Sequence, residues 1–286
     1  MGSLHTQTTF PFEGEFDITA TYQIEHYGEN LFSASHSDEG ERLECLAGAL
    51  DPVSRRNLLA LGLEAQWTCL DVGPGAGTLS GWLASVAGSA GQIAAVDRDT
   101  RFLGHLATKG VNVIEADITD PAFHPAGRFD LVHARLVLMH LRDREEVLRR
   151  LVSWLKPGGL LVVSDALAVG GETSPHEAYR HTMTAYWRLL AETIGSDRHC
   201  VAQYPRMFTE LGLRDIGMDT HLPVVGLDTR FGRFLALSLD QTRERLMAAG
   251  LPAAVYDEAI QHLDNPMTRE MFFAMATCWG RTPTVP

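Results

Sequence analysis

Short apolar runs alternate along the middle of the chain with longer stretches in which apolar residues recur every three or four positions. The apolar runs predict five buried strands, at 68–72, 92–96, 111–114, 131–134 and 160–164. The intervening stretches predict helices at 79–86, 102–108 and 144–155. Strands that alternate with helices in this way form a mostly parallel sheet that is covered on both faces, so we expect an α/β fold.

The regions on either side of this pattern read as mainly helical. Before it we expect a helix at 39–50, then Asp51 as the N-cap of a second helix with Pro52 at its first position, ending near residue 61. Beyond residue 165 the predicted helices are 175–194, 205–211, 230–249 and 252–263, with strands at 216–225 and 270–279. A turn is expected at 156–159.

These elements predict three parts: a helical N-terminal extension at 1–60, a core at 61–170, and cap insertions with the last two strands at 171–286. The extension either folds over the site or only covers the sheet edge, and the pattern leaves both open. It also leaves open a homodimer in which the extensions are exchanged.

Composition narrows the function classes. The 286 residues are 45% hydrophobic with a formal charge of −12, which argues against a broad nucleic-acid footprint. There is no apolar run of the roughly 20 residues that a membrane span needs, and no secretory leader pattern at the start. The four cysteines are scattered, as in reduced proteins, so we expect a cytoplasmic protein without nucleic-acid or membrane partners.

Three glycines follow the first predicted strand at alternate positions. The segment reads Asp71-Val72-Gly73-Pro74-Gly75-Ala76-Gly77, and a dinucleotide-binding loop would need its third glycine at Thr78 instead. With Asp71 two positions ahead, the loop resembles motif I of the class I S-adenosylmethionine-dependent methyltransferases. The resemblance implies a Rossmann-like seven-stranded sheet, S-adenosylmethionine as cofactor and S-adenosylhomocysteine as product. It implies cofactor contacts from Asp71, Gly73, Pro74, Gly75 and Gly77.

Two more acidic residues stand at strand ends. Asp97 follows the second strand, where a carboxylate can accept both ribose hydroxyls, with Arg98 beside it as a candidate for stacking on adenine. Asp117 and Ile118 follow the third strand and resemble the family segment that meets the adenine amine and ring. Each aspartate could instead cap a turn or helix.

The segment 129–141 resembles the fourth-strand region of small-molecule methyltransferases, which implies that Ala134 and Arg135 meet the methionine end of the cofactor. His133 is either a cofactor contact or a core residue. His140 lies further on, where a near-neutral pKa would suit a general base, although a structural role is open. We add Tyr22 and Tyr27 as catalytic candidates, since aromatic residues in the extension would suit a planar or apolar substrate or else belong to the core.

The sequence therefore predicts an enzyme that transfers a methyl group to the O, N or C atom of a small molecule. The stretch 111–165 resembles methyltransferases of ubiquinone and menaquinone synthesis and of bacterial secondary metabolism, which implies the latter setting, including antibiotic biosynthesis. A protein that binds the cofactor without transferring methyl, as a regulator or cyclase, is the alternative. A nicotinamide oxidoreductase lacks its glycine spacing, and a base methyltransferase lacks an N/D-P-P-Y/F segment. We predict no metal, because Asp165 has no acidic partner at the neighbouring strand end.

Overall fold

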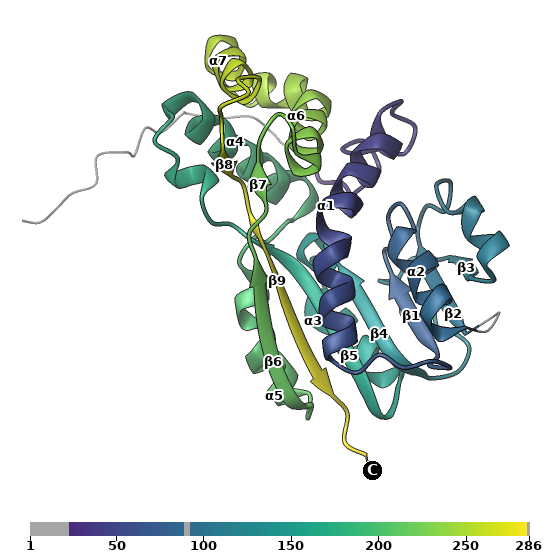
Figure 1. Ribbon diagram of the computed structural model, residues 1–286. Helices are drawn as coiled ribbons and strands as arrows, with labels where there is room; N and C mark the ends of the chain where they lie inside the picture. Colours follow the sequence, from purple (N-terminus) through teal and green to yellow (C-terminus); the bar gives the residue numbers. More distant parts are fainter. Residues whose placement is uncertain (1–22, 89–91, 285–286) are drawn as a thin grey trace, which may run out of the picture.

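The computed structural model describes residues 23–88 and 92–284, and its centre is a seven-stranded sheet (Figure 1). The strands are β1 (Cys69–Val72), β2 (Ile93–Asp97), β3 (Asn112–Glu115), β4 (Phe129–Arg135), β5 (Leu155–Leu167), β6 (Arg214–His221) and β9 (Ala274–Arg281). Their order across the sheet is β3-β2-β1-β4-β5-β9-β6. β9 runs antiparallel to both β5 and β6, whereas the other pairings are parallel. The predicted mostly parallel, Rossmann-like fold is confirmed.

The order in which strands are added to the sheet reverses at β1, which pairs with β2 on one side and with β4 on the other. The β1 residues Cys69, Leu70 and Val72 are fully buried, because helices cover both faces of the sheet there. In doubly wound sheets, ligands bind at the carboxyl ends of the strands beside such a switch point. The fold therefore directs attention to the turns that follow β1, β2 and β4.

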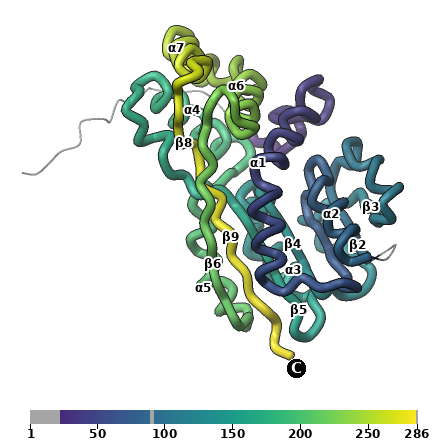
Figure 2. The backbone as a smooth tube through the Cα atoms, viewed as in Figure 1, coloured from purple at the N-terminus to yellow at the C-terminus, as the bar shows by residue number. Residues whose placement is uncertain are grey.

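Seven α-helices surround this sheet in the described part of the chain: α1 (Glu39–Ala60), α2 (Thr78–Ala87), α3 (Arg144–Ser153), α4 (Glu177–Ile194), α5 (Tyr204–Glu210), α6 (Arg230–Ala248) and α7 (Ala253–Leu263). The 3-10 turns are η1 (Gly104–Lys109), η2 (Leu138–His140), η3 (Gly171–Thr173) and η4 (Cys200–Gln203). The helices α4, α6 and α7 gather beyond one end of the sheet, and α1 runs from that cap down along the sheet (Figures 1 and 2).

The expected helix break at Pro52 is wrong. α1 continues through Pro52, and Asp51 lies inside it rather than capping a second helix. Leu50 and Val53, on either side of the proline, are both buried, so the packing of one continuous face outweighs the lost backbone hydrogen bond. The side chain of Asp51 is engaged elsewhere, as described below.

Three other local expectations also need correction. The predicted turn at 156–159 is an irregular stretch inside β5 rather than a turn before it. Leu155 pairs with Phe129 of β4, and Leu160 pairs with Leu131. The helix expected at 102–108 is the 3-10 turn η1. The strands expected at 216–225 and 270–279 are each divided, and their far parts, β7 (Val224–Val225) and β8 (Glu270–Met271), form a separate two-stranded ribbon.

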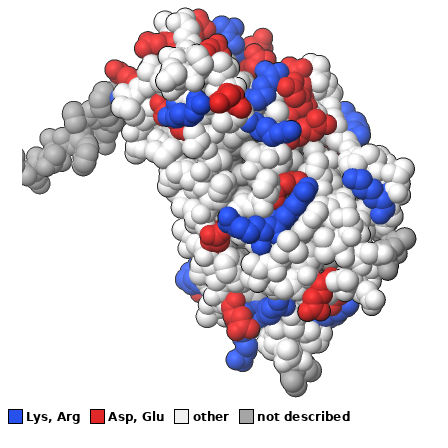
Figure 3. Space-filling view, viewed as in Figure 1, with Lys and Arg blue, Asp and Glu red and all other residues white. Residues whose placement is uncertain are grey.

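Charged side chains of both signs are interspersed over the face shown in Figure 3, which differs from the single basic field of many nucleic-acid-binding surfaces. Among the helices that the structure describes, none is long and apolar enough to cross a membrane.

Candidate cofactor and acceptor site

The loop between β1 and α2 has a backbone that requires glycine. Gly73, Gly75 and Gly77 have φ angles of 63°, 58° and 71°, in the left-handed region that other residues rarely adopt. At Gly73 a Cβ atom would lie 2.3 Å from Cγ2 of Val137, so no side chain fits there. Gly73, Pro74 and Gly75 form part of the wall of a cavity of about 360 Å³. The loop therefore presents bare backbone to that cavity.

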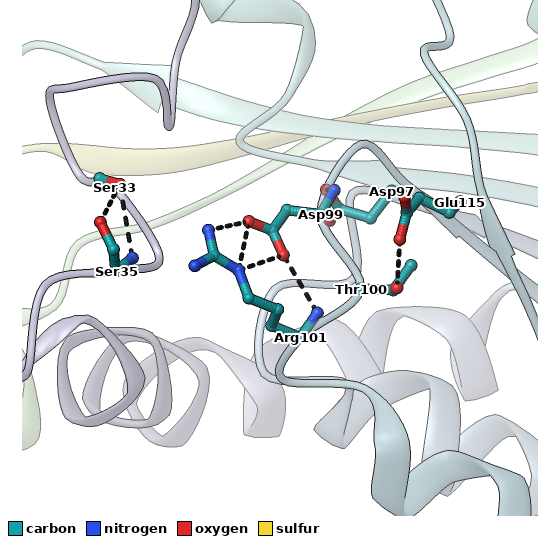
Figure 4. Close-up of polar contacts among 7 residues, drawn as sticks. All are labelled: Ser33, Ser35, Asp97, Asp99, Thr100, Arg101 and Glu115. Atoms are coloured by element: carbon teal, nitrogen blue, oxygen red, sulfur yellow. Dashed lines mark hydrogen bonds and ion pairs between the residues drawn. The ribbon is translucent and has the colours of Figure 1, made fainter.

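Asp97, at the end of β2, forms the next part of the cavity wall. Its Oδ1 accepts the backbone N–H of Asp99 at 3.1 Å, and Asp99 in turn holds Arg101, which fixes the turn (Figure 4). Thr100 in the same turn donates to Glu115 of β3 at 2.8 Å. Burial raises the pKa of Asp97 to about 6, because the charged carboxylate loses solvation there. Asp97 thus serves its own turn and still faces the cavity.

Asp117, Ile118 and Arg98 lie on the wall beside Asp97. Oδ1 of Asp117 accepts from the backbone and hydroxyl of Thr119, and its Oδ2 lies 3.3 Å from Nε of Arg98. Arg98 also pairs with Glu29, at 3.6 Å. The turn-forming role and the cavity-lining role that the sequence allowed for Asp117 are therefore both present.

Asp71 and His133 do not lie on the cavity wall, so of the two roles left open for His133 the structure shows the core one, and it does not place the Asp71 side chain where a direct cofactor contact was expected. They are opposite each other in β1 and β4, each 2% exposed, and His133 Nδ1 lies 2.8 Å from Asp71 Oδ1. Ser80 of α2 donates to the other carboxylate oxygen at 2.5 Å. The pair braces the glycine loop from behind. Gly77 and Ala134 also lie off the wall.

Arg135, at the end of β4, lies on the wall and is held by α1. Its two terminal nitrogens donate to Ser54 Oγ and Asp51 Oδ1, each at 2.9 Å. The other oxygen of Asp51 accepts from Thr78, the first residue of α2, at 2.7 Å. Asp51 thereby ties α1 to both the glycine loop and β4, a role that its apparent capping pattern hid.

Tyr27 and His140 lie in contact on the wall of the same cavity. Their ring centroids are 4.7 Å apart, and His140 Nδ1 lies 2.8 Å from Ser196 Oγ. Burial, reinforced by the positive charges of Arg42 and Arg144, lowers the pKa of His140 to about 3. Burial also raises the pKa of Tyr27, so both side chains are uncharged at neutral pH. Tyr22, the third catalytic candidate, lies outside the described residues.

A buried ion pair that the sequence analysis missed stands beside Tyr27. Arg42 is 2% exposed, forms two 2.7 Å hydrogen bonds with Glu39, and donates to the Tyr27 hydroxyl at 2.5 Å. Its guanidinium lies 4.1 Å from the ring centroid of Phe32 and 5.4 Å from that of Phe234. Charged residues near a helix start usually face water, so no local signal marked Arg42.

Further aromatic side chains line the same cavity. They include Phe32, Tyr186, Trp187, Phe234, Phe272 and Phe273. Trp187 and Phe272 stack with centroids 5.2 Å apart, and Tyr186 meets both edge-on. Aromatic walls favour apolar or planar ligands.

Asp165, the acidic residue considered for a metal, is fully buried and accepts the hydroxyl of Tyr204 at 2.5 Å. Burial raises its pKa to about 7. The described residues contain no group of three or more His, Cys, Asp or Glu side chains that could hold a metal ion.

Comparison with known proteins matches residues 70–163 to the methyltransferase domain family. The chain is 33% identical to phosphoethanolamine N-methyltransferase 1 of Arabidopsis thaliana over 159 residues, which are 52% of this chain and 30% of that protein. It is 27% identical to the methyltransferase GfsG of Streptomyces halstedii over 133 residues, 45% of this chain and 48% of that protein. These matched stretches cover less than half of either relative.

The fold is similar to that of phosphoethanolamine N-methyltransferase 2 from Haemonchus contortus, solved with phosphomonomethylethanolamine and S-adenosylhomocysteine. The TM-score is 0.56 at 16% identity, covering 91% of this chain and 61% of the other. The domain match, the sheet order and the glycine loop all point to a methyltransferase domain. Residues 70–163 therefore match the methyltransferase domain family, and the chain shares its fold with solved methyltransferases.

Proposed function

We propose that this chain binds S-adenosylmethionine in the cavity and transfers its methyl group to a small-molecule acceptor. The observation that carries the proposal is that one cavity joins the glycine loop and Asp97 to Tyr27 and His140. A cofactor held by the glycine loop and Asp97 would then share one cavity with an acceptor beside Tyr27 and His140. Methyl transfer needs this alignment more than it needs chemical assistance.

The glycine loop and the aspartates at the strand ends suit the cofactor. Gly73 and Gly75 leave bare backbone on the cavity wall, and the carboxylate of Asp97 can accept ribose hydroxyls. Asp117 and Ile118 would meet the base, and the backbone at Arg135 would meet the amino-acid end. When bound, S-adenosylmethionine supplies an electrophilic methyl group together with its leaving group.

Tyr27, His140 and the aromatic side chains of the cavity hold the acceptor and exclude water. In the tautomer in which His140 Nδ1–H donates to Ser196 Oγ, Nε2 is unprotonated and can accept the acceptor's proton. Tyr27 fixes the imidazole plane by ring contact, and the aromatic side chains close the chamber around both. The alternative, cofactor binding without transfer, would be favoured by leucine and methionine filling this space. The open chamber argues for transfer instead.

We further propose a role in bacterial secondary metabolism and a cytoplasmic location. The likeness to GfsG of Streptomyces halstedii supports the metabolic setting, although the plant relatives carry a different activity in their names. Location in the cytoplasm would place the enzyme where its methyl donor is made.

Calorimetric titration tests the cofactor. Wild-type protein should bind S-adenosylmethionine and S-adenosylhomocysteine but not NADH, and Asp97→Ala should lose most of that affinity. Asp228→Ala is the matched control, because Asp228 is an exposed aspartate that pairs with Arg269 and does not line the cavity. Preference for NADH, or equal losses in both variants, would contradict the proposal.

A further inference from the structure

We infer that the acceptor is an uncharged, largely aromatic or apolar molecule that presents a hydroxyl group to Tyr27 and His140, and that phosphate-bearing amines are excluded. This inference rests on the proposed function and specifies its substrate class. It rests on the charged side chains of the cavity wall and on the partners that each of them already has.

Every arginine on the described wall of the cavity already has a carboxylate partner. Arg42 pairs with Glu39 at 2.7 Å, Arg98 with Asp117 at 3.3 Å and with Glu29 at 3.6 Å. Arg135 pairs with Asp51 at 2.9 Å. The wall contains no lysine among its described residues, and residues 1–22 contain neither lysine nor arginine. A phosphate group would therefore find no uncommitted arginine or lysine to bind it.

A cationic amine is disfavoured by the same cluster. Of the aromatic faces that could attract an ammonium group, those of Phe32 and Phe234 are already engaged by the guanidinium of Arg42. Trp187 and Phe272 are stacked on each other. Glu39, the nearby carboxylate, is committed to Arg42 through both of its oxygens. An ammonium acceptor would add a further positive charge to a chamber that holds buried Arg42 and, in the complex, the sulfonium, whereas a hydroxyl acceptor adds none.

A hydroxyl acceptor suits the groups that remain. The Tyr27 oxygen accepts from Arg42 and keeps its own proton for donation, and Nε2 of His140 can receive a proton. In the step, a lone pair of the acceptor oxygen forms the new O–CH3 bond while the methyl–sulfur bond breaks and its electron pair stays on sulfur. The hydroxyl proton passes to His140 Nε2, so the positive charge of the sulfonium becomes that of an imidazolium. The lowered pKa of His140 suits this proton, which is very acidic once the oxygen is methylated, and does not suit an ammonium proton.

A matched pair of probes tests the inference on the protein saturated with S-adenosylhomocysteine. Naphthalenemethanol and naphthalenemethylamine have nearly the same shape, but only the amine is charged at neutral pH. Calorimetry should show the alcohol binding at least about tenfold more tightly than the amine, and phosphoethanolamine should show no saturable binding. Tighter binding of the amine, saturable binding of phosphoethanolamine, or failure of the alcohol to bind overturns the inference. Failure of S-adenosylhomocysteine itself to bind would instead overturn the proposed function.

A charge variant gives a second, independent readout. Glu39→Gln frees Arg42, so the variant should acquire binding of inorganic phosphate that the wild type lacks. Glu41→Gln is the control, since Glu41 lies on the same helix and pairs with Arg233 at the surface. Thermal unfolding checks that each variant folds. If Glu39→Gln does not, the uncharged double variant Glu39→Gln/Arg42→Met should still bind naphthalenemethanol and not phosphate. Phosphate binding to wild type, or none to a folded Glu39→Gln, contradicts the assignment.

Discussion

Replacing Gly73 by alanine tests whether the glycine loop has the geometry on which cofactor binding depends. The residue has a φ of 63°, and an added Cβ would lie 2.3 Å from Cγ2 of Val137. The left-handed backbone costs an L-residue about 1–2 kcal/mol. Relieving the overlap requires a shift of about 1 Å in Val137 or the loop, for a further 1–3 kcal/mol or so. We therefore expect Gly73→Ala to lose about 2–5 kcal/mol of unfolding free energy.

Gly212→Ala separates the two contributions. Gly212 has a φ of 79°, but a Cβ there would meet nothing within 4 Å, so only the backbone cost applies. Urea unfolding gives the stability of both variants, and calorimetry with S-adenosylhomocysteine gives the affinity. Gly73→Ala should bind at least about tenfold more weakly, and Gly212→Ala should bind as the wild type does. Adding Val137→Ala to Gly73→Ala should recover part of both losses. Equal stability of the two single variants, or unchanged affinity in Gly73→Ala, would refute the reasoning.

Three further predictions follow from the site. Asp97→Asn should raise the unfolding free energy by about 1–3 kcal/mol at pH 8 while weakening cofactor binding, because burial raises the pKa of this carboxyl to about 6. The gain should shrink as pH falls below about 6, where the wild-type carboxyl binds its proton. His140→Gln should lower the turnover number by a factor on the order of 100 or more with cofactor affinity unchanged. Asp51→Ala should cost about 3 kcal/mol of unfolding free energy, since it leaves Arg135, whose side chain is only 11% exposed, without its carboxylate.

Each of the last two predictions has a matched control. His124→Gln changes an exposed histidine and should leave turnover unchanged. Asp219→Ala breaks an exposed ion pair with Arg56 and should cost less than about 1 kcal/mol. A turnover loss in the His124 variant, or equal destabilisation by the two aspartate variants, would contradict the assigned roles. A stability gain for Asp97→Asn that persists unchanged to pH 4 would contradict the raised pKa.

The sheet and the part of the cavity formed by the glycine loop and the strand-end aspartates were predictable because their signals are local. Apolar runs mark buried strands, and an acidic residue directly after such a run lies at the sheet edge where ligands bind. Asp97 and Asp117 therefore lie on the cavity wall as expected. The predicted break at Pro52 was wrong because burial of Leu50 and Val53 keeps the helix continuous, and capping preferences register none of that packing.

The part of the cavity around Tyr27 and His140 was only partly predictable. His140 and Tyr27 were named and share a cavity, but Arg42 and Glu39 were not recognised. Arg42 is buried by partners that are remote in sequence, including Phe234, and such contacts leave no trace in the local pattern. Asp71 shows the opposite case: its place in the motif was clear, but its side chain braces the loop from behind.

A crystal structure of this chain with S-adenosylhomocysteine would test the central claim most directly. We expect the ribose hydroxyls to contact Asp97, the amino-acid end to lie against Gly73 and Arg135, and the sulfur to face Tyr27 and His140. Electron density for the ligand elsewhere, or with its sulfur turned away from Tyr27 and His140, would contradict the claim.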